Sequence, residues 1–277
     1  MLNITVRGHD LSGVKIIQDM AEKADAQGVY GIQLAMNMTF PQWQKKSQMN
    51  PGLGKYIQNA LARKHVDVNI LSCYINMCHP DLKIREDVLT KFETYIKHAK
   101  YFGATMVASE TGAVTPEIAY TEENFTDEAF DLMASVVERL VKVGEEHKTI
   151  VGIEAGLNHP LYSVETLRKL LARVNSDYLG IIFDATNVIN AATYESQVEI
   201  VEEAFRDFGE KIVAFHLKDF NVIDGKVVPC NLGDGLMDYK KIINIIVKYK
   251  PGCIVVLEET KDDGIARGIE LINESLK

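Results

Sequence analysis

The sequence of 277 residues lacks the marks of secreted, membrane-spanning and disulfide-stabilised proteins. Its N-terminus, MLNITVRGHDLSG, has no long apolar core and no small-residue cleavage site, so we expect no secretory signal. No apolar run approaches the roughly 18 residues that a membrane-spanning helix needs. The four cysteines are scattered and form no CxxC pair, which argues against a disulfide framework. We therefore expect a cytoplasmic protein with no membrane partner.

Basic residues are also in the minority. The chain has 30 Lys and Arg against 39 Asp and Glu, which gives a net charge of −9 at pH 7. A surface that binds nucleic acid needs a basic face for the phosphates, so we expect no nucleic-acid partner. A Gly-x-Gly-x-x-Gly motif is likewise missing after the first expected strand, so the sequence gives no support to a dinucleotide-binding fold.

The sequence does contain a regular alternation of short apolar runs and longer amphipathic stretches. The apolar runs predict strands at 4–6, 30–36, 66–74, 104–109, 149–154, 179–184, 212–217 and 253–258. The stretches between them predict helices at 13–26, 53–64, 84–102, 123–147, 195–208, 239–249 and 264–276, with a further helix capped by Ser163.

This alternation favours an α/β protein with a parallel sheet, because each strand is followed by a helix that returns the chain. Eight such units favour closure into a (β/α)₈ barrel rather than an open doubly wound sheet. Barrels of this type are commonly around 250 residues long. No linker or low-complexity segment interrupts the sequence, so we expect residues 1–277 to form a single barrel domain.

The last four expected strands each end in a side chain that can bind a metal. The motifs are VGIEAG with Glu154, IIFDAT with Asp184, VAFHLKD with His216 and IVVLEET with Glu258. In a parallel barrel these strand ends lie on the same rim, where the active sites of such barrels are found. Three carboxylates and an imidazole at one rim predict a site for one divalent ion, Mn²⁺, Mg²⁺, Co²⁺ or Zn²⁺. The alternative is a structural role, in which the four pair with Arg or Lys inside the barrel.

These motifs resemble those of the xylose isomerase-like barrel superfamily, in particular its sugar isomerase and epimerase branch. That branch includes D-tagatose 3-epimerase and the inosose-processing enzymes. The matching segments are IEAG, FDATN, FHLKD, LGDG and VLEE, and the resemblance is strongest over residues 149–260. The resemblance implies one divalent metal held by Glu154, Asp184, His216 and Glu258. It also implies that Glu154 and Glu258 are catalytic and carry a proton from and to the carbon beside a carbonyl.

The function that the resemblance implies is a metal-dependent sugar or sugar-phosphate isomerase or epimerase that acts through an enediolate. The alternatives are a dehydratase of keto-inositols or other polyols on the same barrel, a non-catalytic sugar-binding barrel, and a metallohydrolase of phosphate esters. One departure concerns Asn187, because relatives carry His there in a D-x-x-H motif. The endonucleases of the superfamily need further His ligands, which this sequence does not supply. Relatives often form dimers or tetramers, so a homodimer or homotetramer is expected.

Six further residues are candidates for binding a sugar or polyol. Asn187 can bond a hydroxyl, and Lys218 can hold a substrate oxygen or pair with Asp184 or Asp219. His9 follows the first strand, where it contacts substrate or is a hydrogen-bonded loop residue. Three more candidates, which follow strands three and four, are Tyr74, Asn76 and Glu110. Tyr74 offers an aromatic face, Asn76 an amide, and Glu110 a contact to substrate or to an arginine. His159 carries no functional prediction.

Overall fold

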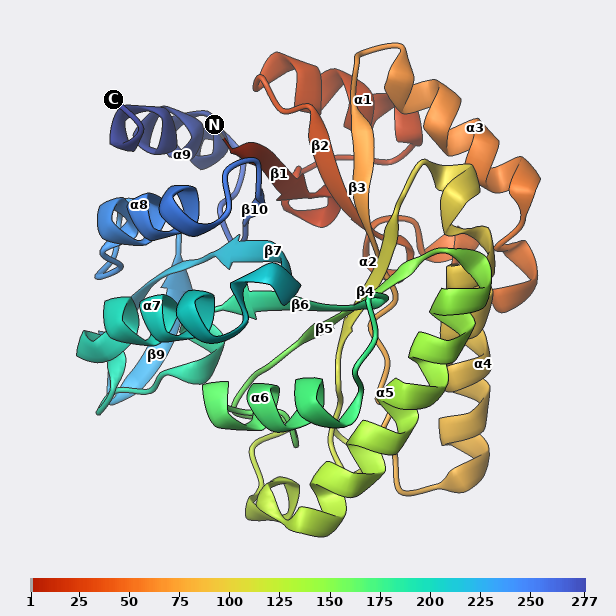
Figure 1. The fold of residues 1–277 in the computed structure, drawn as a ribbon. Helices are drawn as coiled ribbons and strands as arrows, with labels where there is room; N and C mark the ends of the chain where they lie inside the picture. Colours follow the sequence, from red (N-terminus) through yellow and green to blue (C-terminus); the bar gives the residue numbers. More distant parts are fainter. Residues whose placement is uncertain (1) are drawn as a thin grey trace.

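The computed structural model describes residues 2–277 and shows a closed barrel of eight parallel strands (Figure 1). The barrel strands are β1 (Asn3–Arg7), β2 (Gly31–Ala35), β3 (Asp67–Ser72), β4 (Met106–Glu110), β5 (Ile150–Glu154), β6 (Leu179–Asp184), β7 (Ile212–Leu217) and β10 (Ile254–Leu257). Around the barrel they follow the order β1, β10, β7, β6, β5, β4, β3, β2. The predicted single-domain (β/α)₈ barrel is therefore confirmed.

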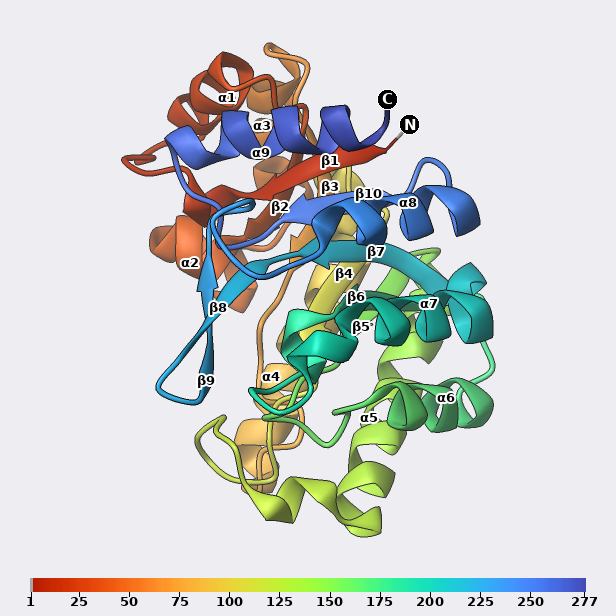
Figure 2. The same ribbon diagram turned by 90° about the vertical axis from the view of Figure 1, so that its left-hand side faces the viewer.

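Helices cover the outside of the barrel, with the two chain ends close together beside α9 in both ribbon views (Figures 1 and 2). They are α1 (Ile17–Ala26), α3 (Pro51–Ala62), α4 (Leu82–His98), α5 (Asp127–His147), α6 (Val164–Arg173), α7 (Gln197–Phe208), α8 (Tyr239–Tyr249) and α9 (Asp263–Ser275). The short helix α2 (Met36–Thr39) directly follows β2 at the end of the barrel. Among residues 2–277, no helix has both the length and the apolar character that crossing a membrane requires.

Side-chain caps set the start of several helices. Ser163 accepts a hydrogen bond from Thr166 N at the start of α6, as the sequence predicted. Asn50, Asp81 and Thr126 do the same for α3, α4 and α5. Each cap satisfies amide groups that have no partner within the helix, so the helices begin at defined residues.

The interior of the barrel is filled by apolar side chains, which form a separate cluster from the layer between strands and helices. Its members are Ile70, Met106, Ala108, Ile182, Ala214 and Val256. A Cβ at Gly152 would lie 3.2 Å from Ile182 and 3.3 Å from Ala108, so this glycine also faces inward. Because side chains alternate along a strand, residues two positions later on β5, β6, β7 and β10 also point into the barrel, but at its rim.

The segment after β7 is the main feature that the sequence did not predict. Strands β8 (Asp219–Ile223) and β9 (Lys226–Cys230) pair antiparallel as a hairpin. It projects from the end of the barrel where β7 finishes (Figure 2). The turn residues Asp224 and Gly225 have φ of 49° and 73°, which is the backbone of a two-residue hairpin turn. The hairpin therefore stands over the rim that carries the predicted site.

The buried carboxylate of Asp219 fixes the base of this hairpin. Its two oxygens accept hydrogen bonds from four backbone amides, at 2.7 to 3.1 Å. The donors are the N–H groups of Phe220, Gly233, Gly235 and Met237. Asp219 is therefore committed to the loop, and it is Asp184 and Glu258 rather than Asp219 that pair with Lys218.

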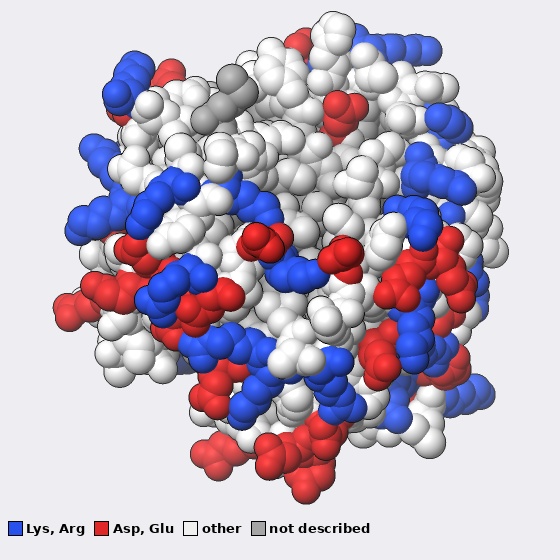
Figure 3. Space-filling model, in the orientation of Figure 1, with Lys and Arg blue, Asp and Glu red and all other residues white. Residues whose placement is uncertain are grey.

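The surface carries charges of both signs. On the face drawn in Figure 3, Lys and Arg side chains alternate with Asp and Glu side chains over most of the outline. This face presents no continuous basic surface among the residues drawn, in keeping with the net charge of −9.

Candidate metal centre

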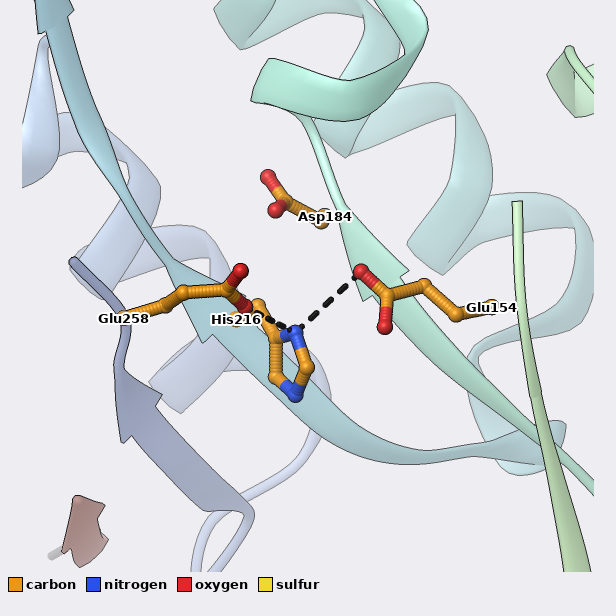
Figure 4. Close-up of side chains that lie close together, drawn as sticks. All are labelled: Glu154, Asp184, His216 and Glu258. Carbon is orange, nitrogen blue, oxygen red and sulfur yellow. Dashed lines mark hydrogen bonds and ion pairs between the residues drawn. The ribbon is translucent and has the colours of Figure 1, made fainter. Parts of the chain in front are cut away.

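Four buried side chains meet at the rim of the barrel (Figure 4). Glu154 and Asp184 are the last residues of β5 and β6, His216 is the fifth residue of β7, and Glu258 directly follows β10. Because these strands are neighbours in the barrel, their ends are adjacent. Each residue offers a ligand atom, and the four atoms lie within 4.8 Å of one another. The sequence therefore placed all four on the correct strands and the fold brings them together.

The imidazole of His216 lies between the two glutamates (Figure 4). Its Nδ1 is 3.2 Å from Glu154 Oε1 and 2.5 Å from Glu258 Oε2. On the other side of the ring, Nε2 lies 3.0 Å from the amide oxygen of Gln33. Since an amide oxygen only accepts, Nε2 carries the hydrogen and Nδ1 is the atom that faces the carboxylates.

Two buried cations pair with the carboxylates of Asp184 and Glu258. Arg7 donates to Glu258 Oε1 at 3.0 Å, and it also binds Asp10 and Glu259. Lys218 Nζ lies 3.2 Å from the same oxygen of Glu258 and 2.7 Å from Asp184 Oδ2. Part of the carboxylate charge is therefore paired within the protein.

Burial and charge shift the pKa values of the four residues in different directions. Burial raises the pKa of Glu154 and of Asp184, and their cationic neighbours only partly offset it. For Glu258, burial is outweighed by the charges of Lys218, His216 and Arg7, which hold its pKa well below the usual range. For His216, burial is outweighed by the charges of Glu154 and Glu258, which raise its pKa to about 10.

The donor set suits a divalent cation. Asp184 Oδ2 and Glu258 Oε2 are buried and accept no hydrogen bond of normal geometry, although both lie beside cationic groups. Buried carboxylate oxygens are normally hydrogen-bonded or bound to a metal. The other oxygen of each group is occupied, by Thr186 N for Asp184 and by Arg7 for Glu258. Lys218 Nζ lies 2.7 Å from Asp184 Oδ2, while Glu258 Oε2 lies beside His216 Nδ1. With one ligand atom of each residue within 4.8 Å of the others, the set fits one divalent metal.

Asn187, the departure from the D-x-x-H motif that the resemblance implied, joins this network. Its Nδ2 donates to Glu154 Oε1 at 2.7 Å, and its Oδ1 accepts from Lys218 Nζ at 2.6 Å. The amide therefore links a predicted metal ligand to the neighbouring cation. Both Asn187 and Lys218 also line a cavity of about 550 Å³, where a substrate oxygen could reach them. Substrate binding by these two residues stays a prediction.

The cavity lies at the same end of the barrel and has the size of a small-molecule site. Its walls come from the loops after β4, β5, β6 and β7 and from the β8–β9 hairpin. The residues are Glu110, Tyr120, Gly156, Leu157, Asn158, His159, Thr186, Asn187, Ile189, Asn190, Ala191, Lys218, Gly225, Lys226, Val227 and Pro229. A cavity next to a cluster of metal-ligating groups is the arrangement expected for an active site.

The remaining candidates for substrate binding have different surroundings. The hydroxyl of Tyr74 accepts a hydrogen bond from Gln33 Nε2 at 2.9 Å. Tyr74 therefore orients the amide of Gln33, whose oxygen lies against His216. Asn76 uses its amide to bind backbone groups of Cys78, Ala113 and Thr115. Both ring nitrogens of His9 are buried without a hydrogen-bond partner. Substrate contacts by Tyr74, Asn76 and His9 remain predictions.

Glu110 lines the cavity and lies 3.7 Å from Nε2 of His159. The sequence suggested a contact to substrate or to an arginine; the neighbour is a histidine instead of an arginine, and a substrate contact stays a prediction. Arg7, Gln33 and His159 are therefore the site residues that sequence reasoning missed. Gln33 carried a usable signal, because it is the one polar side chain in an otherwise apolar strand, and Arg7 carried a weaker one as the charged residue that ends its strand. His159 lies in a loop and carried none.

Comparison with known families settles the relationship of the chain. A family model described as a xylose isomerase-like TIM barrel matches residues 21–275. This chain belongs to the xylose isomerase-like TIM barrel family. The family resemblance that the strand-end motifs predicted is thus confirmed over most of the chain.

Individual relatives are distant. The chain is 24% identical over 243 residues to an inosose dehydratase of Glaesserella parasuis serovar 5 (strain SH0165), which covers 78% of this chain and 79% of that protein. A crystal structure of a D-tagatose 3-epimerase-like protein superposes with a TM-score of 0.78, at 18% identity, over 99% of this chain and 97% of that one. The zinc-bound structure of an IOLI protein superposes with a TM-score of 0.73, at 16% identity, over 99% and 96% of the two chains. At these identities the structures show the shared fold.

Proposed function

We propose that this protein is a metal-dependent enzyme that removes a proton from a carbon next to the carbonyl group of a sugar or polyol. The observation that carries the proposal is the convergence of four buried donor groups beside a cavity of about 550 Å³. Glu154, Asp184, His216 and Glu258 hold one divalent ion, chosen from Mn²⁺, Mg²⁺, Co²⁺ and Zn²⁺. Such an ion supplies a Lewis acid that polarises a carbonyl and stabilises negative charge on substrate oxygens.

The chain's own residues supply the proton transfers. Glu154 and Glu258 approach from opposite sides of His216, so their carboxylates can address opposite faces of a substrate carbon (Figure 4). One takes the proton and the other returns it, as paired carboxylates do in general acid–base catalysis. Lys218 and Asn187 bind substrate hydroxyl or carbonyl oxygens from the cavity wall. Return of the proton to the opposite face, or to the neighbouring carbon, makes the enzyme an epimerase or isomerase.

A second candidate is a dehydratase on the same site, in which the enolate loses a hydroxyl group instead of regaining a proton. One relative, at 24% identity, is an inosose dehydratase, which supports this candidate. The ionisable pair formed by Glu110 and His159 in the cavity wall supports it independently. Both candidates share the first step, the removal of the proton beside the carbonyl.

Deuterium exchange tests this shared step directly. The protein is loaded with Mn²⁺ or Co²⁺, and a panel of ketohexoses and keto-inositols is incubated with it in D₂O and followed by proton NMR. We expect the proton beside the carbonyl of at least one substrate to be replaced by deuterium, and the exchange to stop after chelation of the metal. A panel in which no compound exchanges would contradict the proposal and favour a non-catalytic sugar-binding barrel.

A further inference from the structure

Glu110 and His159 form a second ionisable pair in the cavity wall, separate from the four predicted metal ligands. Glu110 ends β4, and His159 lies in the loop after β5. Their side chains approach to 3.7 Å, between Glu110 Oε1 and His159 Nε2. The His159 side chain is 4% exposed and that of Glu110 is 35% exposed. The histidine is thus held inside the wall, while the glutamate is open to the cavity.

The orientation of the His159 ring is fixed by the backbone. Nδ1 lies 2.9 Å from the carbonyl oxygen of Gly112, and a carbonyl oxygen only accepts. Nδ1 therefore carries a hydrogen, and Nε2 points toward Glu110. On another side, a Cβ at Gly156 would lie 3.0 Å from the ring, so the glycine there leaves the space that the imidazole fills.

The carbonyl of Gly112 is held in place because the loop around it is fixed by contacts with Asn76. Gly112 has a φ of 75°, and a Cβ there would lie 2.3 Å from Asn76 Oδ1. Asn76 accepts from Ala113 N and donates to the carbonyl of Thr115, which fixes the segment on both sides. Only glycine combines this φ with so close an approach.

A buried asparagine then ties this loop to the loop that carries the histidine. Asn124 accepts from Val114 N at 3.0 Å and donates to the carbonyl of Asn158 at 2.8 Å. Asn158 directly precedes His159, so the two loops are joined next to the pair. This degree of organisation is typical of a side chain that must present one ring nitrogen in one direction.

We propose that His159, oriented by Gly112 and paired with Glu110, is a general acid that protonates a hydroxyl group as it leaves the substrate. The inference rests on the proposed function, because the leaving group is expelled by the enolate formed beside the predicted metal site. Glu110 and His159 line the same cavity as Lys218 and Asn187, which touch the predicted ligands. Although burial would lower the pKa of His159, Glu110 raises it, which favours the protonated imidazole.

The step balances as the loss of one water. A glutamate of the predicted metal site takes the proton from the carbon beside the carbonyl, and the electron pair of that C–H bond forms the enolate. The enolate expels the hydroxyl of the next carbon as a C=C bond forms and the C–O bond breaks. His159 gives its Nε2 proton to the departing oxygen, which leaves as water. The proton on the glutamate returns to solvent, and His159 regains one from solvent.

The substrate class follows from this step. It is a polyhydroxy ketone with a hydroxyl on the carbon two positions from the carbonyl carbon, and a carbon chain or ring that fits a cavity of about 550 Å³. Its product is a conjugated enone, which absorbs in the near ultraviolet and is distinguishable from the saturated substrate.

The experiment measures exchange and elimination together on the Mn²⁺-loaded protein. Ketohexoses and keto-inositols are incubated in D₂O with the unaltered protein, with His159→Gln, with Glu110→Gln, and with the control His147→Gln. His147 lies in the last turn of α5, outside the described site. Deuterium incorporation is followed by proton NMR, and enone formation by near-ultraviolet absorbance. Circular dichroism establishes that each variant is folded.

We expect the unaltered protein and His147→Gln to form enone from at least one compound. His159→Gln lowers the rate of enone formation by about 100-fold or more, since general acids contribute about 10² to 10⁴, while exchange falls by less than about tenfold. Glu110→Gln, which keeps the shape but removes the charge, lowers enone formation by about tenfold. Elimination at an equal rate in His159→Gln, or exchange without any elimination in the unaltered protein, would overturn the inference and leave the proposed function standing. Absence of exchange in the unaltered protein would overturn the proposed function and the inference with it.

Discussion

The amide oxygen of Gln33 lies 3.0 Å from Nε2 of His216. Gln33 is in β2 and His216 in β7, so the contact crosses the interior of the barrel from strands that are not neighbours. Tyr74 accepts from the other end of the Gln33 amide, which fixes its orientation. This pair sets the hydrogen of His216 on Nε2 and leaves the lone pair of Nδ1 for a metal, as partners of metal-binding histidines commonly do.

Loss of the Gln33 side chain is therefore expected to weaken metal binding. Gln33→Ala should lower the affinity for Mn²⁺ or Zn²⁺ by about 10- to 100-fold, the range for partners of metal-ligating histidines. Gln33→Glu, whose carboxylate also accepts from Nε2, should retain the affinity within about tenfold. Titration calorimetry measures both, with the exposed Gln44→Ala as the control. Equal affinities for Gln33→Ala and Gln44→Ala would refute a role for Gln33 in metal binding.

Metal binding is expected to release protons. Without a metal, burial of His216 is outweighed by the charges of Glu154 and Glu258, which raise its pKa to about 10. The imidazole therefore holds a proton at neutral pH that a metal must displace, so the affinity should rise with pH up to about pH 10, by about tenfold per unit for one proton. Calorimetry at pH 7 in two buffers of different ionisation enthalpy counts the protons released. A count of zero, with an affinity that does not change between pH 6 and 9, would show that the prediction is wrong.

Arg7 is expected to be the most important single residue for the stability of the rim. The Arg7 side chain is 8% exposed, and its guanidinium group pairs with Asp10, Glu258 and Glu259. Arg7→Met removes the cation and leaves buried carboxylates without it, which should lower the free energy of unfolding by about 3 to 5 kcal/mol. Arg206→Met, on an exposed ion pair with Asp207, should change it by no more than about 1 kcal/mol. Urea denaturation compares the two, and equal losses would contradict this account of Arg7.

Substitution of either glutamate by glutamine is expected to slow the proton transfer. Glu154→Gln keeps an oxygen that can bind a metal but cannot take up a proton from carbon, so deuterium exchange should fall by about 10² to 10⁴. Glu258→Gln should lower exchange similarly and weaken the contact to Arg7 as well. Bound metal is measured in parallel by mass spectrometry, so that loss of the ion is distinguished from loss of the base. Glu270→Gln, on the outside of α9, serves as the control. Normal deuterium exchange in both site variants would show that neither glutamate transfers the proton.

The sequence predicted the barrel and the four rim residues because both depend on local patterns. Strand and helix periods, and a polar residue at each strand end, are visible without knowledge of the fold. The β8–β9 hairpin could also have been predicted, since Asp224 and Gly225 form a typical hairpin-turn pair between two segments rich in Val and Ile. The hairpin does not belong to the alternation of strands and helices that predicts the barrel.

The contacts that orient the site could not be predicted in the same way. Gln33 meets His216 across 183 positions, and Arg7 meets Glu258 across 251. Such pairs depend on the closure and stagger of the barrel, which no local pattern encodes. The loop after β5 presents a similar case, because the orientation of His159 depends on a carbonyl from the loop after β4.

The most direct test of the central claim is the anomalous scattering of crystals grown with Mn²⁺. The account predicts one strong peak at the rim, with one atom each of Glu154, Asp184, His216 and Glu258 about 2.0 to 2.4 Å from it. His216 should reach the ion through Nδ1, with its Nε2 bonded to Gln33. A peak at another place would contradict the account. So would a rim without a peak at saturating Mn²⁺, because Lys218 and Arg7 alone would then neutralise the carboxylates.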